Sequence, residues 1–390
     1  MPTKFLHTAD LQLGLTRHFL GSDAQPRFAA ARNDAIRSIG ELAADEGCSF
    51  VVACGDVFES NHVSRQVVVR ALDALGDVPV PVYLLPGNHD PLDAGSVYRS
   101  ATFRASVPSN VHVLESGAPV EASPGAWLVA APWLSKHPLE DLAARSLSDL
   151  RELLADADGR AVGPARILVA HGIVDLLSPD ATDPAAILLA GLENALGAGI
   201  VHYVALGDRH SVTDVGATGR VWYSGAPEAT DYDEVDSGAV LVVELPDDLH
   251  APPRVEPRQI GTWRFVREVH PLDSGDDIAR LAADLQGRDA KDRTVLKLGF
   301  EGSLSLRDKA RIDEVLESAR DLYAGVQLWD RMTDLAVLPE DADFESLGLA
   351  GFAAEALEEL RAAAERPGVD GVTARDALAL LVRLAGSGER

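Results

Sequence analysis

The first 245 residues of the sequence predict an α/β fold of stacked sheets flanked by helices. Short apolar segments, polar turns and amphipathic segments alternate along them, and this alternation is typical of sheets that helices cover. Two longer segments, Arg27 to Glu46 and Ser64 to Leu75, carry apolar residues at three- and four-residue spacing and are predicted helices. The predicted strands are the short apolar runs at residues 4–8, 50–54, 80–85, 111–114, 127–130, 167–170, 201–206, 221–223 and 238–244.

A proline-rich segment separates this pattern from a second, smaller one. The segment LPDDLHAPPRVEP, at residues 245–257, is predicted to be a linker or a crossing loop. The pattern that follows predicts a small α/β unit of about seventy residues. Its strands are expected at residues 263–270, 294–301 and 326–332, and its helices at residues 276–286 and 305–322.

The chain changes again after Pro339. Two segments with an apolar face follow, and the Pro-Gly pair at residues 367–368 divides them into two predicted helices. Short helices at this position pack either on their own domain or on a partner, and the sequence favours neither. We therefore expect three parts, at residues 1–257, 258–335 and 336–390.

The composition restricts the class of protein. The chain has 390 residues, 46% of them hydrophobic, and can therefore bury a sizeable core in two or three structural units. No apolar run approaches the roughly 18 residues that a membrane helix needs, and Met1 leads directly into a strand-like segment, so we expect a cytoplasmic protein. Cys48 and Cys54 lie in or beside an apolar strand and are predicted to be buried, reduced thiols.

The formal net charge of -26 limits how the chain can hold a polyanion. Proteins that bind DNA through their own surface usually carry a basic stripe, which releases counterions from the phosphates. No such stripe is evident in this sequence. Either the substrate is not a long nucleic acid, or metal ions supply the local positive charge while a partner subunit supplies the grip.

Five segments place an Asp, Asn or His directly after a predicted strand. In an open α/β sheet the carboxyl ends of the strands meet in one crevice, so residues far apart in sequence can converge there. Carboxylate and amide oxygens suit hard divalent cations, and imidazole suits borderline ones. One such residue alone is more often a turn or cap residue, but five in this order predict a metal site. They are Asp10, Asp56, Asn88, His171 and His210.

A site with these ligands can hold two cations. Two metal ions about 4 Å apart share a bridging carboxylate, activate a water molecule and neutralise the charge that develops on a phosphoryl group. Asp56, in the second of the five segments, is our choice for the bridge. This pattern indicates hydrolysis of a phosphoester.

The same residues resemble a known family. Asp10, the GD pair at 55–56, the GNHD run at 87–90, the HG pair at 171–172 and His210 are similar, in order and approximate spacing, to the calcineurin-like metallophosphoesterases. The blocks FLHTADLQLG, GDVFE, LLPGNHD and YSGAPEATDYDE resemble SbcD-type DNA repair exonucleases more specifically. The resemblance covers the whole chain. GDVFE followed by GNHD is its most specific part, and the matches in the cap and the tail are weak.

The resemblance implies a fold and a set of roles. The fold would be a β-sandwich flanked by helices, with a small α/β capping domain and C-terminal helices that bind a partner. One metal ion would be held by Asp10, Gln12, Asp56 and His210, and the other by Asp56, Asn88, His171 and Asp208. His89 would face the scissile phosphate as an acid or a transition-state stabiliser.

Two positions depart from the family pattern. Members usually carry His where this chain has Gln12, and a second His where it has Asp208. Both changes replace nitrogen with oxygen and make the site more anionic, which favours Mn²⁺ or Mg²⁺ over Zn²⁺. Glu59 stands where some relatives place a His that aids cleavage, so that assistance is not expected in this chain.

The leading interpretation is a metal-dependent DNA nuclease, either an exonuclease or an endonuclease, that uses two divalent metal ions, foremost Mn²⁺. The resemblance implies a homodimer that works on DNA in repair together with an SbcC-type ATPase, an SMC-like coiled-coil protein. Two alternatives stay open. One is a phosphoesterase for nucleotides or phosphoproteins, and the other is a non-catalytic subunit whose metal site has degenerated at Gln12 and Asp208.

Overall fold

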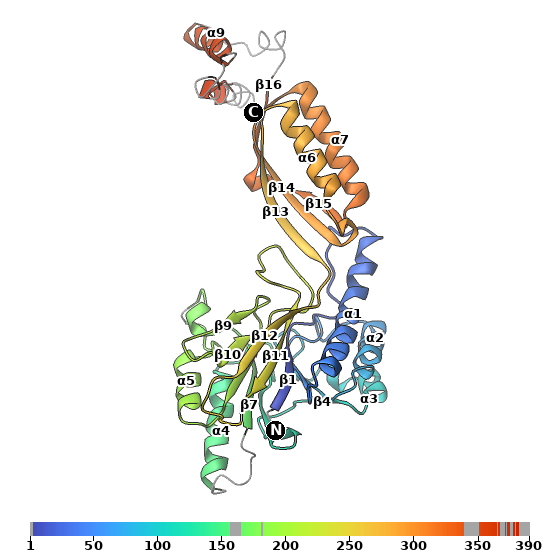
Figure 1. Ribbon diagram of the computed structural model, residues 1–390, viewed down its shortest axis with the longest axis vertical. Coiled ribbons are helices and arrows are strands. Elements are labelled where there is room, and N and C mark those ends of the chain that lie inside the picture. The colour runs from blue at the N-terminus through green and yellow to red at the C-terminus, as the bar shows by residue number, and fades with distance from the viewer. Residues whose placement is uncertain are drawn as a thin grey trace. The chain divides into compact units, whose positions relative to one another are not determined.

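The computed structural model divides into two compact units (Figure 1). One unit contains Met1–Arg17 and Gln25–Trp263, and the other contains His18–Ala24 and Arg264–Arg390. The structure describes residues 3–156, 165–180, 182–338 and 351–364, and the single positions 366, 371, 373, 374, 377, 378, 380 and 381.

The first unit contains a six-stranded sheet in the order β12-β11-β1-β2-β3-β4. Strands β1 to β4 run parallel, β11 pairs antiparallel with β1, and β12 pairs antiparallel with β11 at the edge of the sheet. The strands span Thr3–Thr8 (β1), Val51–Cys54 (β2), Val82–Leu85 (β3), Val111–Val113 (β4), Ala239–Leu245 (β11) and Arg254–Gln259 (β12).

A second six-stranded sheet has the order β5-β6-β7-β8-β10-β9. Its four central strands are parallel, and the short β5 and β9 pair antiparallel at the two edges. The strands span Val120–Ser123 (β5), Ala126–Ala131 (β6), Ala165–His171 (β7), Tyr203–Gly207 (β8), Thr213–Asp214 (β9) and Val221–Tyr223 (β10).

The two sheets pack face to face over a buried apolar layer. Phe5 of β1 stacks on Phe50 and meets the edge of Tyr203 from β8, so side chains of both sheets interlock there. Helices cover the outer faces, with α1, α2 and α3 on the first sheet and α4 and α5 on the second. This arrangement confirms the predicted α/β class of stacked sheets flanked by helices. The helices span Ala24–Asp45 (α1), Arg65–Gly76 (α2), Ala101–Ser106 (α3), Leu142–Asp156 (α4) and Leu189–Gly197 (α5).

The second unit is a parallel sheet with helices on one face. Central β14 pairs with β13 on one side and with β15 and β16 on the other. Ser274 and Ser305 cap the N-termini of α6 and α7, and both helices pack apolar residues onto the sheet. The elements span Arg264–Leu272 (β13), Gly275–Gly287 (α6), Thr294–Ser305 (β14), Leu306–Leu322 (α7), Gly325–Leu328 (β15), Asp334–Leu338 (β16) and Phe352–Ala364 (α9).

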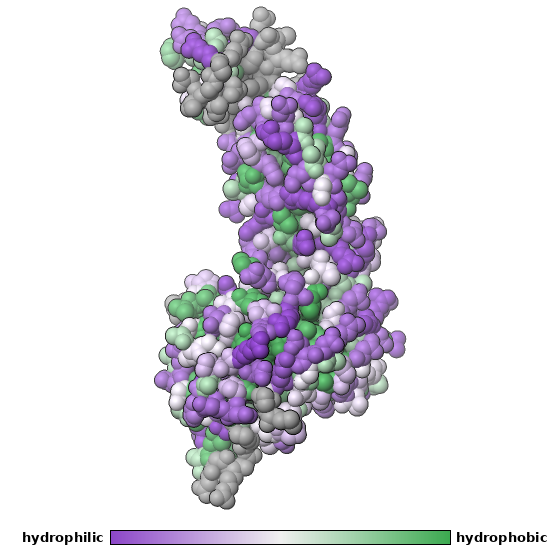
Figure 2. Space-filling model, viewed as in Figure 1, coloured by the Kyte–Doolittle hydropathy of each residue, from purple (hydrophilic) through white to green (hydrophobic). Residues whose placement is uncertain are grey.

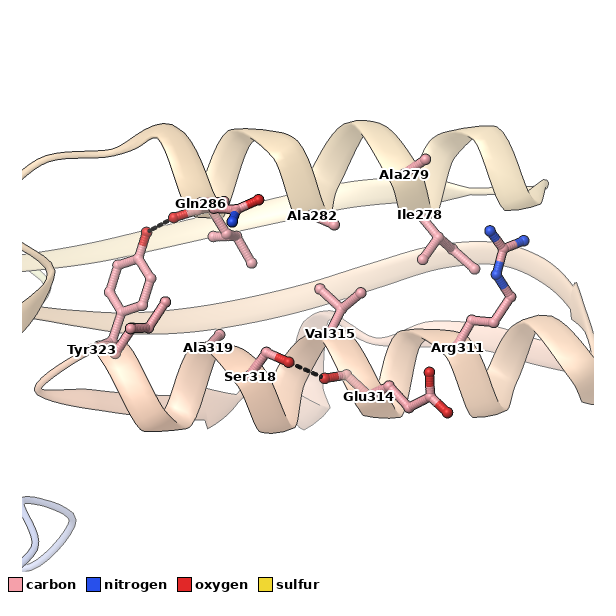
Figure 3. Close-up of a pocket in the computed structure, with 12 residues that line it drawn as sticks. Ile278, Ala279, Ala282, Gln286, Arg311, Glu314, Val315, Ser318, Ala319 and Tyr323 are labelled. Atoms are coloured by element: carbon pink, nitrogen blue, oxygen red, sulfur yellow. Dashed lines mark hydrogen bonds between the residues drawn. The ribbon is translucent and has the colours of Figure 1, made fainter.

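A groove of about 390 Å³ runs between α6 and α7 (Figure 3). Ala282 of α6 lies opposite Val315 of α7, Ala319 also lines the groove, and the Tyr323 hydroxyl lies at one end and donates a hydrogen bond to the Leu285 carbonyl at 2.7 Å. The small alanine side chains on both helices therefore leave space between them. Hydrophilic residues are spread over the face seen in Figure 2 and are interspersed with smaller hydrophobic patches.

Three predictions for local structure were wrong or lie partly outside the described chain. The segment at 245–257 is a loop only in its first part, because β12 begins at Arg254; Pro257 is tolerated there because β12 is an edge strand. The strand predicted at 326–332 ends at Leu328, because residues 330–332 form a 3₁₀ turn. The second predicted C-terminal helix falls mostly outside the described residues.

Two simpler predictions concern membrane segments and cysteines. Among the described residues, the helices are too short or too polar to cross a bilayer. Cys48 and Cys54 are both buried and carry free thiols, as predicted.

Candidate metal centre

The carboxyl ends of strands from both sheets converge on one point. Asp10 follows β1, Asp56 follows β2, and His171 ends β7 in the opposite sheet. Ligand atoms of these three buried residues all lie within 4.8 Å of one another. Short backbone hydrogen bonds hold the strand ends together, from the Asp10 amide to the Gly55 carbonyl and from the Gly172 amide to the Gly207 carbonyl, both at 3.1 Å. Residues from distant parts of the sequence therefore share one small volume.

Around His171 the side chains form an oxygen-rich group. The imidazole Nε2 lies 2.7 Å from Asn88 Oδ1, 3.3 Å from Asp56 Oδ1 and 3.7 Å from Asp208 Oδ1. Its Nδ1 lies 2.8 Å from the Cys54 carbonyl, which can only accept a hydrogen bond. Nδ1 therefore carries a proton, and Nε2 faces the three oxygens.

Around His210 the arrangement is looser. His210 Nε2 lies 3.8 Å from Asp10 Oδ1 and 3.1 Å from the amide nitrogen of Gln12. The Asp10 carboxylate also accepts the backbone N–H of Asp208 at 3.0 Å. Gln12 thus presents a donor to the imidazole, and its amide group would have to turn before Oε1 could bind a cation. The structure brings every predicted ligand residue to this place, with Gln12 in this orientation.

The donor set fits a divalent cation. Asn88 Oδ1 faces only other acceptors, namely the carboxylate of Asp56 and Nε2 of His171. Turning the amide would place its nitrogen 3.2 Å from both Asp56 oxygens and 2.7 Å from the imidazole, so this position accommodates either a hydrogen-bond donor or a cation between the acceptors. Carboxylate, amide and imidazole ligands in this mixture suit Mn²⁺, Mg²⁺ and related ions.

The electrostatics lead to the same conclusion. Burial, together with the nearby carboxylates of Asp56 and Asp208 and against the opposing effect of the His210 and His171 imidazoles, raises the pKa of Asp10 to about 7. Burial alone would lower the pKa of His171, but the Asp56 carboxylate holds it well above the usual range. The carboxylates of this cluster can therefore all be ionised together only when protonated imidazoles or bound cations supply positive charge.

The backbone is strained at the same strand ends. Six residues other than glycine have a left-handed φ among those described, and four of them belong to this site. Such conformations cost free energy and persist where a function requires them. Gly55 and Gly207 cannot carry a side chain, because a Cβ would collide with the His171 ring at position 55 and with the Cys54 carbonyl at position 207. The four strained residues are Asp10 (53°), Gln12 (45°), Asp56 (50°) and Asp208 (98°).

His89 occupies the open side of the cluster. Its side chain is 40% exposed, whereas that of Asp56 is 3% exposed. The His89 backbone N–H donates to Asp56 Oδ1 at 3.0 Å, and its Nδ1 lies 2.9 Å from the Glu59 carbonyl. His89 Nε2 lies 3.9 Å from Asp56 Oδ2. This imidazole is anchored to the Glu59 carbonyl at Nδ1, and its Nε2, on the side of Asp56, can meet a substrate.

Residues without a predicted role support the site. The buried Asp90 carboxylate accepts the Gly87 N–H at 2.8 Å, the Phe58 N–H at 2.9 Å and the Tyr98 hydroxyl at 2.6 Å, which ties the Asn88 turn to the Asp56 turn. Behind His210, Thr230 and Glu234 contact Nδ1. Asp90 and Glu234 lie inside motifs that the sequence singled out, but nothing in the sequence identified their partners.

Comparison with known proteins identifies the first unit. The family model for calcineurin-like phosphoesterases matches residues 3–243. No curated protein sequence matches the chain. Among solved structures, the chain is similar to the protein TT1561 of Thermus thermophilus, with 12% identity over 66% of this chain and 99% of that one and a TM-score of 0.40. It is also similar to a dimetal phosphatase from Danio rerio, with 12% identity over 65% and 99% and a TM-score of 0.38.

The matched region covers more than half of the chain and includes all the strand-end residues of the site. Members of this family use divalent metal ions, and the convergent residues provide a candidate site for them. The chain therefore belongs to the calcineurin-like phosphoesterase family.

Proposed function

We propose that this chain is a metal-dependent DNA nuclease that hydrolyses phosphodiester bonds with two divalent cations. The observation that carries the proposal is the cluster of buried acceptors at the strand ends, in which ligand atoms of Asp10, Asp56 and His171 lie within 4.8 Å of one another. The GDVFE and GNHD blocks that supply Asp56 and Asn88 resemble those of SbcD-type exonucleases. That resemblance supports DNA as the substrate and a role in repair.

Each cation would be held by one group of side chains, with Asp56 shared between them. When bound, the two ions supply a nucleophilic water and neutralise charge on the phosphoryl oxygens. The oxygen-rich donor set supports Mn²⁺ or Mg²⁺. The first group is Asp10, Gln12, Asp56 and His210, and the second is Asp56, Asn88, His171 and Asp208.

The protein's own contribution is to fix these groups and to deliver a proton. Asp56 is immobilised by the His89 N–H, and His171 by the Cys54 carbonyl, so neither has to reorganise as charge develops. His89 donates Nδ1–H to the Glu59 carbonyl, which leaves Nε2–H of the imidazolium form to protonate the leaving oxygen, with the neutral imidazole as product, or to stabilise the charged phosphate. This exposed imidazole therefore acts as the acid in the proposed reaction.

The acidic surface supports a shared task in DNA binding. We propose that the chain forms a homodimer and that this homodimer works in the cytoplasm together with an SMC-type coiled-coil ATPase. The ATPase would make most of the contacts with DNA. Residues 258–335 would serve as the capping domain and residues 336–390 would bind the ATPase. With a formal charge of -26, the chain alone should show only a shallow dependence of DNA affinity on salt.

One observation favours a second candidate, a non-catalytic subunit with a degenerate metal site. Gln12 presents its amide nitrogen to His210 Nε2 at 3.1 Å, at the place where a cation would bind. The double substitution Gln12→His, Asp208→His tests this candidate. A chain that is inactive as found but cleaves DNA after this repair would support the degenerate site.

Mn²⁺-dependent cleavage of a labelled oligonucleotide by the natural chain and by Asp56→Ala tests the proposed nuclease. Asp56→Ala removes the carboxylate shared by both ligand groups, and we expect cleavage to fall by about 10³-fold or more. Asp34→Ala, an exposed position on α1, is the matched control and should retain full activity.

Substrate choice separates the nuclease from a phosphoesterase for small substrates. The nuclease should turn over a chromogenic phosphodiester as well as the oligonucleotide. Turnover of monoesters alone, or cleavage that survives Asp56→Ala, contradicts the proposal.

A further inference from the structure

Two side chains contact Nδ1 of His210, whereas its Nε2 faces Gln12 and Asp10. Its Nδ1 lies 2.8 Å from Thr230 Oγ1 and 2.9 Å from Glu234 Oε1. The Glu234 carboxylate accepts the Thr230 N–H at 2.9 Å through its other oxygen and also accepts the Thr230 hydroxyl hydrogen. The Thr230 hydroxyl therefore uses a lone pair toward the imidazole, and both neighbours of Nδ1 are acceptors.

This contact fixes which nitrogen of His210 can bind a cation. Two acceptors at Nδ1 favour the proton on that atom, so the lone pair of Nε2 faces the ligand group, where the Gln12 amide nitrogen lies 3.1 Å away and Asp10 Oδ1 lies 3.8 Å away. A carboxylate behind a metal-binding imidazole orients the ring and makes the ligand nitrogen more basic. The Glu234 side chain is only 6% exposed, so solvent does not compete strongly for its oxygens.

The loop that carries these side chains is anchored near the ligands. The buried Arg32 guanidinium donates to the Ala229 carbonyl at 3.2 Å and to the Leu11 carbonyl at 3.3 Å. Leu11 lies between Asp10 and Gln12, so a single guanidinium spans the ligand loop and the supporting loop. Arg17 also donates to the Thr230 carbonyl, at 2.9 Å through its Nε.

The other imidazole of the site is held differently. His171 donates Nδ1–H to the backbone carbonyl of Cys54, so no side chain is needed for its orientation. Of these two imidazoles, His210 is the one whose orientation depends on side chains that a substitution can remove.

We propose that Glu234 is a positioning residue that holds the His210 ring in the orientation needed for metal binding. The inference rests on the proposed role of His210 as a metal ligand. Glu234 needs no contact with the substrate, because it acts through the imidazole. Its loss should therefore weaken one of the two bound ions selectively.

Mn²⁺ binding to Glu234→Gln, followed by electron paramagnetic resonance of the full chain without nucleic acid, tests this role. We expect one Mn²⁺ ion to bind about 10- to 100-fold more weakly, since loss of a supporting carboxylate typically has this effect. The electron spin-echo modulation from imidazole nitrogen should fall to the level seen in His210→Asn.

Glu228→Gln is the matched control. Glu228 is a buried carboxylate of the same loop, but it accepts the backbone N–H groups of Thr262 and Trp263 instead of contacting His210. This variant should keep the natural Mn²⁺ affinities within about twofold. Should Glu234→Gln fail to fold, Glu234→Asp keeps the charge but withdraws it by one methylene group, and an intermediate loss of affinity is expected.

The outcomes separate this inference from the proposed function. Natural Mn²⁺ affinities and undiminished imidazole modulation in the Glu234 variant overturn the positioning role alone. If the natural chain takes up no Mn²⁺, the proposed metal centre fails and the inference with it. Because nucleic acid is absent from the experiment, a chain that binds Mn²⁺ but cuts no DNA leaves the inference standing.

Discussion

The two ends of the second sheet hold histidines in opposite environments. At the carboxyl ends of its strands lies His171. The nearby carboxylates of Asp56 and Asp10, which follow strands of the first sheet, raise the pKa of its imidazole against the effect of burial. At the amino ends, His202 precedes β8, and its Nδ1 accepts the backbone N–H of Arg166 at 3.0 Å. Burial, reinforced by the guanidinium of Arg166, lowers the pKa of His202 to about 4. When no metal is bound, the histidine at the carboxyl ends is therefore charged, and the histidine at the amino ends is neutral.

This difference distinguishes the end of the sheet that carries the candidate site from the end that does not. The amino-end arginines are satisfied by backbone carbonyls, as in the hydrogen bond of 2.7 Å from Arg166 to Ile200. At the carboxyl ends, the Asp10 and Asp56 carboxylates gather with the imidazole of His171, and the backbone of both aspartates is left-handed. Clustered titratable groups and backbone strain at one end mark the site, whereas the net charge of the chain does not.

Substitution of His89 should have the largest effect on activity and should distinguish the residue that faces the substrate from the residues that hold cations. We expect His89→Asn to lower kcat by about 10²- to 10⁴-fold while Mn²⁺ affinity stays within about threefold, because His89 supplies a proton and is not a ligand. Steady-state kinetics and Mn²⁺ titration on the same preparation measure both quantities. A variant that loses Mn²⁺ binding in proportion to kcat would place His89 among the ligands.

The next effect concerns the amino ends. The folded pKa of His202, about 4, is below the ordinary value of 6.5, so the unfolded state binds more protons and stability falls as the pH drops below 6.5. Between pH 6.5 and 5 this one group should cost about 2 kcal/mol of unfolding free energy.

His202→Asn should flatten that part of the pH profile, since its amide oxygen can still accept the Arg166 N–H. Urea unfolding of both chains at pH 6.5 and pH 5 measures the difference. Parallel profiles for the two chains would show that His202 is not held neutral.

The smallest expected effect concerns the looser half of the metal centre. Gln12→His replaces an amide that donates toward His210 with an imidazole that can bind a cation, and we expect one Zn²⁺ ion to bind about tenfold more tightly. Gln259→His, on edge strand β12, is the matched control and should change nothing. Isothermal titration with Zn²⁺ measures the effect, and unchanged affinity would mean that residue 12 does not contact the metal.

The sequence predicted the buried strands well, because their apolar runs are bounded by polar turns. Val221–Tyr223 was placed correctly at both ends. Strand β12 was missed because Pro257 and several polar residues indicate a loop, and only the pairing of Pro257 with Leu241 reveals an edge strand. Strand β15 ends early because nothing in the pattern of residues 326–332 distinguishes a strand from the 3₁₀ turn that follows Leu328.

The site divides in a similar way. Ligand candidates such as Asp56 could be recognised, since residue type and position after a strand both carry a signal. The partners that orient the imidazoles could not. For His171 the partner is the carbonyl of Cys54, which any residue would supply, and for His210 it is Glu234, whose contact depends on a loop conformation. The direction in which the Gln12 amide points also depends on tertiary packing.

The number of Mn²⁺ ions that the chain binds at equilibrium is a direct test of the two-metal centre. Equilibrium dialysis against Mn²⁺, followed by elemental analysis by mass spectrometry, should find two ions per natural chain and a clear deficit in Asp56→Ala, because Asp56 serves both ligand groups. One ion or none per natural chain would contradict a two-metal centre at the carboxyl ends of these strands.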